Sequence, residues 1–398
     1  MIRPVIRLAA RLASLLAAIA LSSGALAQGK PVLIGAAISQ SGYLADLAKG
    51  MRNALLLWEE QVNAAGGLLG RPVELKLYDD ASDALRNTAL YELLVKDDGA
   101  ELLIGGFGSA ATSMGAAVAE RNRRVMVNAT GSSPSIHKRV YRYLFQVPPL
   151  SDTTAVGVLQ LAKTLGLKSV MVTAREEKTA ETVLELLRKD APAYGVELVP
   201  SIFYSMDVVN GLAPFARQLR TIAPDVVVTP VSPRDAAELV RGFKAAGYVP
   251  KMFVARGSTD PEFIKQVGID AEYSVGFSSY EPRQPTAGNA AFVKAYRDKF
   301  KVAPDFHAAC GWAAGTVIQA AVARAGSFEQ EKLRAAFLAL ETDNVLGGYK
   351  VAVDGSQVMA QSLVVQILKG RREVIWPVAY RTAEPVLPMP GWDRRKPL

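Results

Sequence analysis

Two kinds of segment alternate along most of the chain, and this alternation restricts the possible folds more than any other feature of the sequence. Short apolar runs rich in β-branched residues, such as 32–38, predict strands that are buried on both faces. Apolar residues at helical spacing, such as Leu55, Trp58 and Val62 in residues 46–64, predict helices. A repeated strand–helix pattern is typical of an α/β fold in which helices cover both faces of a doubly wound parallel sheet.

Two proline-containing pauses, at residues 146–149 and 280–285, divide the alternation. A mature chain of about 370 residues also exceeds what one hydrophobic core comfortably holds, so we expect two α/β units. Such sheets bind ligands at the carboxyl ends of their strands, and two units facing each other would form a cleft for a small molecule. The expected strands are 32–38, 73–78, 101–104, 124–128, 169–173, 196–203, 225–229, 252–255, 273–278, 348–353 and 361–368, and the expected helices are 46–64, 84–96, 109–120, 179–189, 212–221, 233–246, 261–267, 289–299, 306–323 and 329–340.

The first residues have the composition of an export signal. Three arginines lie within the first eleven residues, residues 15–21 are wholly apolar, and residues 25–27 read Ala-Leu-Ala, a small-residue cleavage site. The apolar run is shorter than the roughly 20 residues that a membrane-spanning helix needs. We therefore expect residues 1–27 to be a cleaved signal peptide.

The charges and the few chemically special residues exclude several functional classes. The formal net charge of +8 falls to +5 without the three signal-peptide arginines, because that segment contains no acid. This excess is spread out without a dense basic block, which argues against a nucleic-acid partner. Cys310 is the single cysteine, and His137 and His307 are the two histidines. We therefore expect no disulfide framework, no metal site and no other cofactor.

Three short motifs occur in a fixed order near the start of the first series. Ser41-Gly42 is followed by an N-x-x-G-G-x-x-G motif at residues 63–70 and by Asp79-Asp80. Their order and spacing resemble the extracellular solute-binding proteins of the branched-chain amino-acid ABC transport type. The resemblance covers essentially the whole mature chain. It continues through residues 104–109, 127–134 and 346–348.

The resemblance implies a type I periplasmic binding fold, in which two doubly wound parallel-sheet lobes are joined by three crossovers and close on a ligand. Such a protein is not an enzyme. It binds a small carboxylate-bearing solute in the periplasm, as a monomer, and delivers it to the membrane permease of an ABC transporter. The expected divisions are residues 1–27 for the signal peptide, 28–147 with 281–343 for lobe 1, 148–280 with 344–375 for lobe 2, and 376–398 for a C-terminal strap.

A run of small residues at 105–109 follows an expected strand and leads into a helix. Free N–H groups and the positive dipole end make a helix start a site for anions, and glycines such as Gly108 let the backbone approach a ligand. Ser109 lies at this start, where a serine also serves as an ordinary N-cap. In members of the resembled family a serine at this loop contacts the ligand carboxylate, so we expect Gly108 and Ser109 to bind ligand.

Thr130, Gly131 and Ser132 follow the next expected strand, and family members hold the ligand head group with this loop. An ordinary solvated turn would have the same composition. The resemblance also places Tyr43 on a loop facing the cleft, where an aromatic ring would contact the side-chain end of a ligand; a surface turn residue is the alternative. Tyr280, at the second pause, is included among the expected ligand contacts.

The second lobe departs from the resemblance at two places that we expect to line the ligand site. Lys178 stands where amino-acid binders have a tyrosine, and Arg256 and Gly257 stand where they place an acid that pairs with the ligand's ammonium group. A buried ammonium without a counter-charge is costly, so the sequence admits an acid without an amine as well as an amino acid. Alternatively, the two cations are solvated rim charges, or Glu176 or Glu177 supplies the missing charge.

Two other functional classes are alternatives to a transport receptor. Residues 106–111 superficially match a dinucleotide-binding fingerprint, which would fit an NAD-linked enzyme. The match belongs to the third expected strand instead of the first, and an exported protein meets little NAD. A ligand-sensing receptor of the same fold would have the same site, and the sequence does not separate it from a transport receptor.

Overall fold

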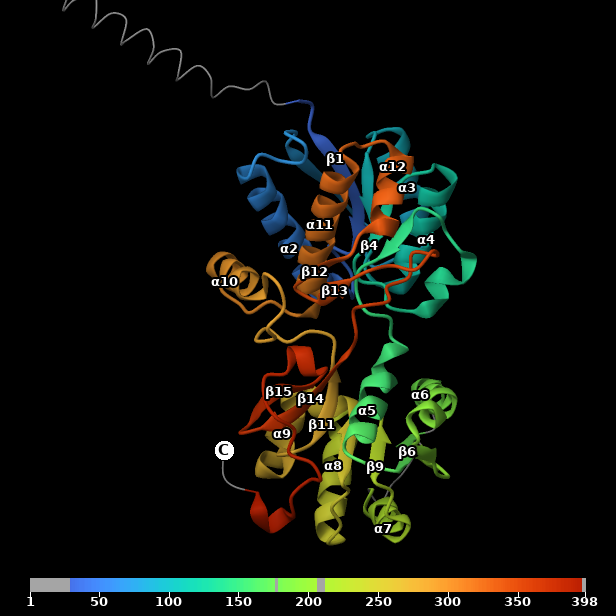
Figure 1. Ribbon diagram of the computed structural model, residues 1–398, viewed down its shortest axis with the longest axis vertical. Helices are drawn as coiled ribbons and strands as arrows, with labels where there is room; N and C mark the ends of the chain where they lie inside the picture. The colour runs from blue at the N-terminus through green and yellow to red at the C-terminus, as the bar shows by residue number, and fades with distance from the viewer. Residues whose placement is uncertain (1–28, 176–177, 206–211, 396–398) are drawn as a thin grey trace, which may run out of the picture.

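The first of two large sheets is entirely parallel and contains the N-terminal strands (Figure 1). The computed structural model describes residues 29–175, 178–205 and 212–395. The strand order is β2-β1-β3-β4-β5, so the carboxyl ends of β3 and β4 lie side by side at one edge of the sheet. The strands are β1 (Val32–Ile38), β2 (Val73–Asp79), β3 (Leu102–Ile104), β4 (Met126–Asn128) and β5 (Leu144–Gln146).

Helices cover both faces of this sheet, as the alternating pattern predicts. Four of them share one core with one face of the strands, and α3 and α4 pack on the opposite face. The four are α2 (Ala45–Ala64), α10 (Asn289–Phe300), α11 (Phe306–Ala325) and α12 (Gln330–Ala339), and the other two are α3 (Arg86–Lys96) and α4 (Gly108–Arg121).

Helix α11 has the length and hydropathy of a membrane span, but it is a core helix of the first lobe. It is the one helix in the described part of the chain that meets both criteria, and 61% of its apolar window is buried. It packs against α2, where an added Cβ on Gly315 would come within 2.4 Å of the Trp58 ring. The absence of a side chain at this position therefore lets the two helices approach closely.

The second large sheet is mixed. Its strand order is β15-β14-β11-β10-β9-β6-β7, with β8 pairing with β6 beyond this path, and β14 and β15 form an antiparallel hairpin at one edge. The single strand expected at 196–203 is two strands, β7 and β8, separated around Pro200, which cannot donate a ladder hydrogen bond. The strands are β6 (Ser169–Arg175), β7 (Glu197–Leu198), β8 (Ile202–Tyr204), β9 (Val226–Thr229), β10 (Met252–Ala255), β11 (Val275–Ser278), β14 (Leu363–Leu368) and β15 (Arg371–Trp376).

Helices α5 and α6 cover one face of the second sheet, and α7, α8 and α9 cover the other. The sequence pattern predicted neither β5 nor α5. A glycine weakens the signal of α5, because Gly157 lies inside the helix, where an added Cβ would come within 2.9 Å of a Val364 methyl group on β14. The helices are α5 (Thr153–Thr164), α6 (Lys178–Asp190), α7 (Ala213–Ile222), α8 (Pro233–Ala245) and α9 (Pro261–Val267).

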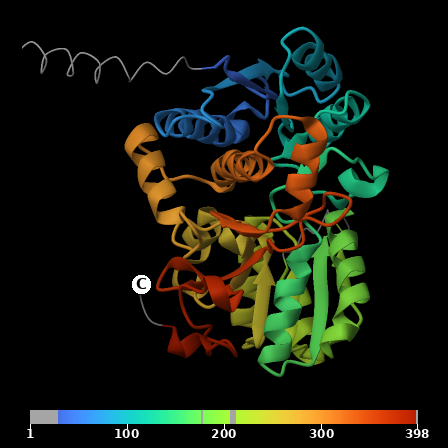
Figure 2. The same ribbon diagram turned by 45° about the horizontal axis from the view of Figure 1, so that its top comes forward.

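Three segments connect the two lobes, at residues 147–152, 279–288 and 350–362 (Figures 1 and 2). Each lobe therefore contains parts of the chain that are far apart in sequence. The first lobe takes α10, α11 and α12 from the C-terminal half, and the second lobe takes its antiparallel hairpin from beyond the third crossing.

A small hairpin of β12 (Thr342–Asn344) and β13 (Gly347–Tyr349) precedes the third crossing. The sequence-based division assigned residues 344–375 to lobe 2. In the structure, Leu346 and Tyr349 belong to the core of the first lobe, because the hairpin directly follows α12 and buries its apolar side chains there. The strand that enters the second sheet begins only at β14.

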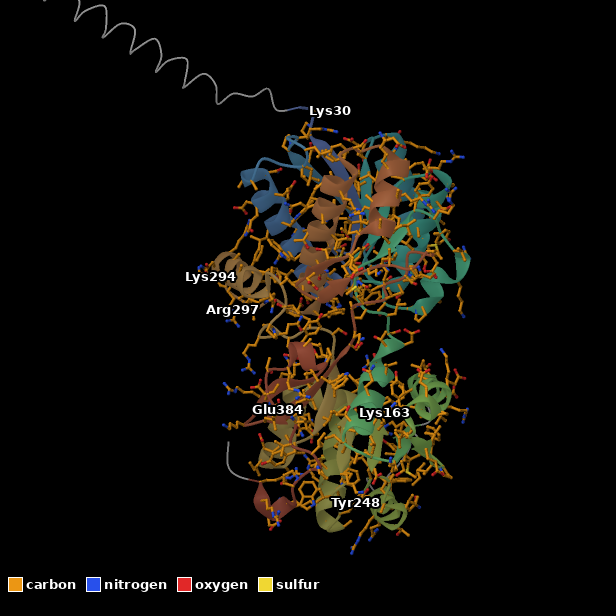
Figure 3. The ribbon with its side chains drawn as sticks, viewed as in Figure 1. Lys30, Lys163, Tyr248, Lys294, Arg297 and Glu384 are labelled. Atoms are coloured by element: carbon orange, nitrogen blue, oxygen red, sulfur yellow. The ribbon has the colours of Figure 1, made fainter. Side chains whose placement is uncertain are left out.

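The residues after β15 start beside the first lobe, where the Gly348 N–H donates to the Tyr380 hydroxyl at 3.1 Å, and their last part reaches the far end of the second lobe (Figures 1 and 3). The Met389 N–H donates to the Lys251 carbonyl at 2.8 Å, and the Trp392 indole N–H donates to the Tyr248 carbonyl at 3.0 Å. This last part therefore covers the second lobe on the side opposite the cleft.

Candidate ligand-binding cleft

The start of α4 forms part of the first-lobe edge that faces the cleft. The helix begins at Gly108, with Phe107 as its N-cap residue, so Ser109 lies in the first turn and is not the N-cap. Gly108 has φ +81, a left-handed conformation that glycine adopts without strain. Its N–H donates to the Thr130 hydroxyl at 2.9 Å, and that hydroxyl lies 3.3 Å from the Gly106 carbonyl. Thr130 therefore fixes the start of the helix, and the first-turn N–H groups that follow have no partner within the helix.

Ser109 connects this helix start to the loop after β4. Its hydroxyl oxygen accepts the Ser133 N–H at 3.2 Å. The Ser132 carbonyl accepts the Ser151 N–H at 2.8 Å, which ties the same loop to the first crossing between the lobes. The structure therefore brings Gly108, Ser109 and Ser132 together at one edge of the first sheet.

A buried amide network, which no sequence motif indicated, lies behind this loop. Asn128 and Gln146 are both 0% exposed. Asn128 accepts the Gly131 N–H at 2.8 Å and donates to the Gly131 carbonyl at 2.8 Å, and the Gln146 amide donates to that carbonyl at 2.7 Å. His137 reaches the Gln146 side-chain oxygen at 3.2 Å from the other side. An added Cβ on Gly131 would lie 2.7 Å from an Ile136 methyl group, so the loop is held in place on all sides.

Two aromatic groups flank the start of α4. Phe107 and His307, at the start of α11, pack edge to face with ring centroids 4.8 Å apart, and burial lowers the pKa of His307, which favours the neutral ring. Sequence reasoning did not select His307, because its sequence neighbours carry no ligand-binding pattern.

Tyr43 is 82% exposed on the loop after β1. That loop is fixed by Asp79, whose carboxylate accepts the Ser41 hydroxyl at 2.6 Å and the Gln40 N–H at 2.8 Å. The Ser41 hydrogen bond and the surrounding backbone N–H groups lower the pKa of Asp79 to about 2. The structure places the Tyr43 ring in solvent at the end of an ordered loop.

The second-lobe edge is hollow. A cavity of about 1270 Å³ lies there, and its walls come from the ends of β9 and β11, from α5 and α6, and from the turn that follows β10. The first lobe contributes Ser133 and part of the short helix Pro134–Arg139. Among the described residues, three basic and three acidic side chains line the cavity: Lys138, Arg256, Arg372, Asp152, Glu185 and Asp260.

Gly257 lines this cavity, and it also allows close packing. An added Cβ there would lie 2.6 Å from the Pro233 nitrogen, so the turn after β10 could not approach α8 with a larger residue. Lys178 is the first residue of α6, but its side chain lies outside the described part of the structure, as do Glu176 and Glu177. Arg256 is exposed at the cavity wall.

Tyr280 occupies a different place from the other expected ligand contacts. It is 4% exposed within the first-lobe core, and its hydroxyl donates to the Asn289 side-chain oxygen at 2.7 Å. Burial raises the pKa of this hydroxyl well above its ordinary value. The structure therefore does not bring Tyr280 together with Ser109 and Ser132.

An ion pair closes the end of β6 in the second lobe. The Arg175 guanidinium donates to the two carboxylate oxygens of Asp235 at 2.5 and 2.8 Å, and Asp235 is 3% exposed. Among the described residues no group of three or more His, Cys, Asp or Glu side chains could hold a metal ion. The site therefore offers hydrogen bonds, charges and apolar surface for holding a small molecule.

The two lobes, the three crossings and the cleft between them define a type I periplasmic binding fold. The profile of the periplasmic binding protein family matches residues 31–372, and the chain belongs to this family. It is a solute-binding protein of the branched-chain amino-acid ABC transporter type, as the resemblance in the sequence predicted.

Named relatives and solved structures agree with this assignment. The chain is 23% identical to the leucine-, isoleucine-, valine-, threonine- and alanine-binding protein of Pseudomonas aeruginosa, over 75% of this chain and 80% of that protein. It is 24% identical to Leu/Ile/Val-binding protein homolog 8 of Brucella abortus, over 87% and 90%.

Two solved structures illustrate the range of ligands on this fold. A substrate-binding protein from Desulfitobacterium hafniense in complex with Leu has a TM-score of 0.70 at 19% identity, covering 87% of this chain and 99% of that one. A solute-binding protein from Rhodopseudomonas palustris in complex with 3,4-dihydroxybenzoic acid has a TM-score of 0.65 at 19% identity, covering 87% and 95%.

Proposed function

We propose that this protein captures a small carboxylate-bearing solute in its cleft, after export and removal of residues 1–27, and delivers it to the permease of an ABC transporter. The observation that carries the proposal is the start of α4, which faces the cleft beside a loop of small residues. The protein would act by binding and release, without catalysis.

The carboxylate would bind at the N-terminus of α4. The N–H groups of Ser109 and Ala110 lie in the first turn, where the helix itself supplies no acceptors. The helix dipole adds about 0.3–1 kcal/mol for an anion at such a position, and each hydrogen bond to a charged group contributes about 1.5–3 kcal/mol. Because Asn128 and Gln146 already fix the adjacent loop, binding would cost little ordering entropy.

The second lobe would decide whether the solute also carries an amine. Arg256 and Gly257 occupy the turn after β10, and the cation there favours an acidic solute. Relatives of this fold hold leucine in one case and 3,4-dihydroxybenzoic acid in another, so both an amino acid and an amine-free acid are compatible with the architecture.

Lobe closure would couple binding to delivery. The cleft lies between lobes joined by three segments, and a solute that contacts both lobes stabilises the closed state by its differential affinity for that state. The permease would then recognise the closed shape.

A substitution at Ser109 tests the anion site. In Ser109→Asp a fixed carboxylate would occupy the start of α4, compete with the ligand, and stabilise the helix through its dipole. Ser109→Asn has the same shape without the charge and serves as the matched control. We expect at least tenfold weaker binding of acids by Ser109→Asp than by Ser109→Asn, with both variants as stable as the wild type.

The ligand for this test comes from a thermal-shift screen of amino acids and of aromatic and aliphatic acids. A solute present at 100 times its dissociation constant stabilises the protein by about 2.7 kcal/mol, which such a screen detects. Equal affinity of the two Ser109 variants for every acid that binds would contradict the proposed carboxylate site.

A further inference from the structure

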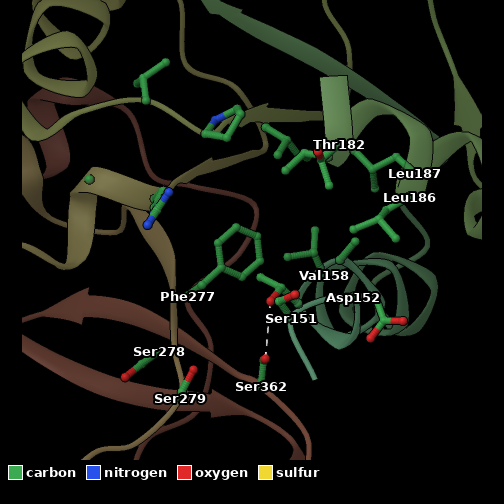
Figure 4. Close-up of a pocket in the computed structure, with 18 of the residues that line it drawn as sticks. Ser151, Asp152, Val158, Thr182, Leu186, Leu187, Phe277, Ser278, Ser279 and Ser362 are labelled. Carbon is green, nitrogen blue, oxygen red and sulfur yellow. Dashed lines mark hydrogen bonds between the residues drawn. The ribbon is translucent and has the colours of Figure 1, made fainter. Parts of the chain in front are cut away.

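The cavity at the second-lobe edge extends beyond the cleft into the lobe itself, between α5 and α6 (Figure 4). Its inner walls are apolar. Val158 on α5 and Leu187 on α6 are each 1% exposed, and Phe277 at the end of β11 extends toward Val158 in Figure 4. Among the described residues of the first lobe, only the segment 133–138 contributes to the cavity lining.

The cavity comes close to the proposed carboxylate site at Ser133. Ser133 lines the cavity, and its N–H donates to the Ser109 hydroxyl oxygen at 3.2 Å. One end of the cavity is therefore one hydrogen bond away from Ser109, in the first turn of α4. A molecule held by its carboxylate at Ser109 would extend past Ser133 into this cavity.

The lining of the cavity has polar and apolar parts. Hydroxyl groups and cations gather near the first lobe and at the strand ends, where Ser133, Lys138 and Ser279 line the cavity. Between the two helices, apolar side chains such as Val158 and Leu187 line the cavity together with Thr182 and Glu185. The apolar part of this lining offers few hydrogen bonds to water and favours an apolar group.

We propose that the natural solute is an acid with an extended apolar tail, of the medium-chain acyl or arylalkyl class, whose tail enters the space between α5 and α6. This inference rests on the proposed function, because the carboxylate site orients the molecule. The volume of about 1270 Å³ belongs to the whole cavity, including its part in the cleft, and exceeds the roughly 300–1,000 Å³ typical of pockets for small organic ligands, so the cavity as a whole has room for a head group and a tail. Val158, Leu187 and Phe277 all belong to the second lobe, so the tail site does not depend on closure.

Calorimetric titration of the mature protein with butanoate, hexanoate and octanoate tests this proposal. Burial of each methylene group contributes a factor of about four in affinity, so octanoate should bind at least a hundredfold more tightly than butanoate. An affinity that stays flat or falls beyond four carbons would overturn the tail site.

Two variants that fill the cavity between α5 and α6 test where the apolar tail of the solute binds. Ala155→Leu on α5 and Val183→Phe on α6 each add bulk to the cavity from opposite walls, so a folding defect in one does not remove the test. We expect the gain per methylene to disappear in both. Lys163→Leu adds the same leucine to the exposed surface of α5 and is the matched control, with the wild-type gain (Figure 3).

The outcomes separate the two proposals. If acids of every length bind equally well and Ser109→Asp weakens all of them, the carboxylate site stands and the tail site is wrong. If octanoate binds tightly but Ser109→Asp has no effect, the proposed carboxylate site is wrong. Retention of the chain-length gain in both filling variants would also overturn the tail site between α5 and α6.

Discussion

The two sheet edges that face the cleft are built in opposite ways. At the first edge, Asn128 and Gln146 fill the space behind the ligand loop with neutral hydrogen bonds that hold Gly131 from both sides. At the second edge, a cavity of about 1270 Å³ extends between two helices, and the buried polar pair is ionic, Arg175 with Asp235. A satisfied neutral network rigidifies its surroundings, whereas an unfilled apolar space accepts groups of different shapes. The contrast agrees with a fixed head-group site in one lobe and a tolerant tail site in the other.

The largest expected effect comes from Gly355→Ala, at the third crossing. Gly355 has φ +79, and an added Cβ would lie 1.9 Å from the Leu144 carbonyl oxygen. Its own carbonyl accepts the Gln146 N–H at 2.8 Å, so the clash would reach the first edge directly. We expect a loss of about 3–5 kcal/mol in the free energy of unfolding, measured with denaturant. The control is Gly108→Ala, at a position with a similar φ but with open space around the added Cβ, and it should lose only about 1 kcal/mol in the free energy of unfolding. Equal losses of stability in the two variants would show that crowding around Gly355 is unimportant.

A pair of buried glutamines, one in each lobe, sharpens the comparison. Gln366 on β14 is also 0% exposed, and its amide donates to the carbonyls of Tyr273 and Val386 at 3.0 Å each. Replacement of Gln146 or Gln366 by Ala should destabilise the protein by about 3 kcal/mol, because buried partners lose their hydrogen bonds. We expect only Gln146→Ala to weaken ligand binding as well, by calorimetry. A similar loss of affinity in Gln366→Ala would mean that rigidity is not specific to the first edge.

Asp235→Ala tests the ion pair between Arg175 and Asp235 at the edge of the second sheet. Loss of the carboxylate leaves the Arg175 guanidinium, which is 22% exposed, without its bidentate partner. We expect a loss of about 2–3 kcal/mol, somewhat below the range for fully buried pairs. The control is Glu238→Ala, which removes an exposed pair with Arg234 and should cost under about 0.5 kcal/mol. If the two variants unfold at the same denaturant concentration, the ion pair does not hold the second edge.

The smallest expected effect is a pH dependence at the outer loop of the first lobe. The pKa of Asp79 is lowered in the folded protein to about 2, so its carboxylate stabilises the fold above the ordinary pKa and this contribution disappears as the pH falls from about 4 to about 2. Asp79→Ala should therefore be less stable than the wild type at pH 7 and nearly equal to it near pH 2. A difference in urea unfolding that stays constant with pH would assign the effect of the substitution to packing.

Several elements of both lobes could be predicted from the sequence, for local reasons. Helices such as α9 and α11 have strong apolar periodicity or a clear cap, and their starts match the expected ones. Ser109 and Ser132 could be selected because loops of small residues directly follow strands, and parallel topology brings the carboxyl ends of β3 and β4 together.

The remaining features depend on contacts between distant segments. The Asn128–Gln146 network joins residues on two neighbouring strands, and the second strand, β5, is only three residues long. The cavity between α5 and α6 could not be foreseen, because α5 itself gave a weak pattern around Gly157. Tyr280, expected as a ligand contact at the second pause, also depends on distant segments: it is buried, and its hydroxyl bonds to Asn289.

The three crossings also have a consequence for the order in which the chain can fold. The first lobe needs α11 and α12 to cover one face of its sheet, and the second sheet needs β14 and β15 to complete its edge. Neither lobe can therefore finish folding when only the N-terminal half of the chain has been made. Contacts this distant in sequence form slowly, so a newly synthesised chain would stay incompletely folded until its last strands are available, a state that would suit the export proposed above.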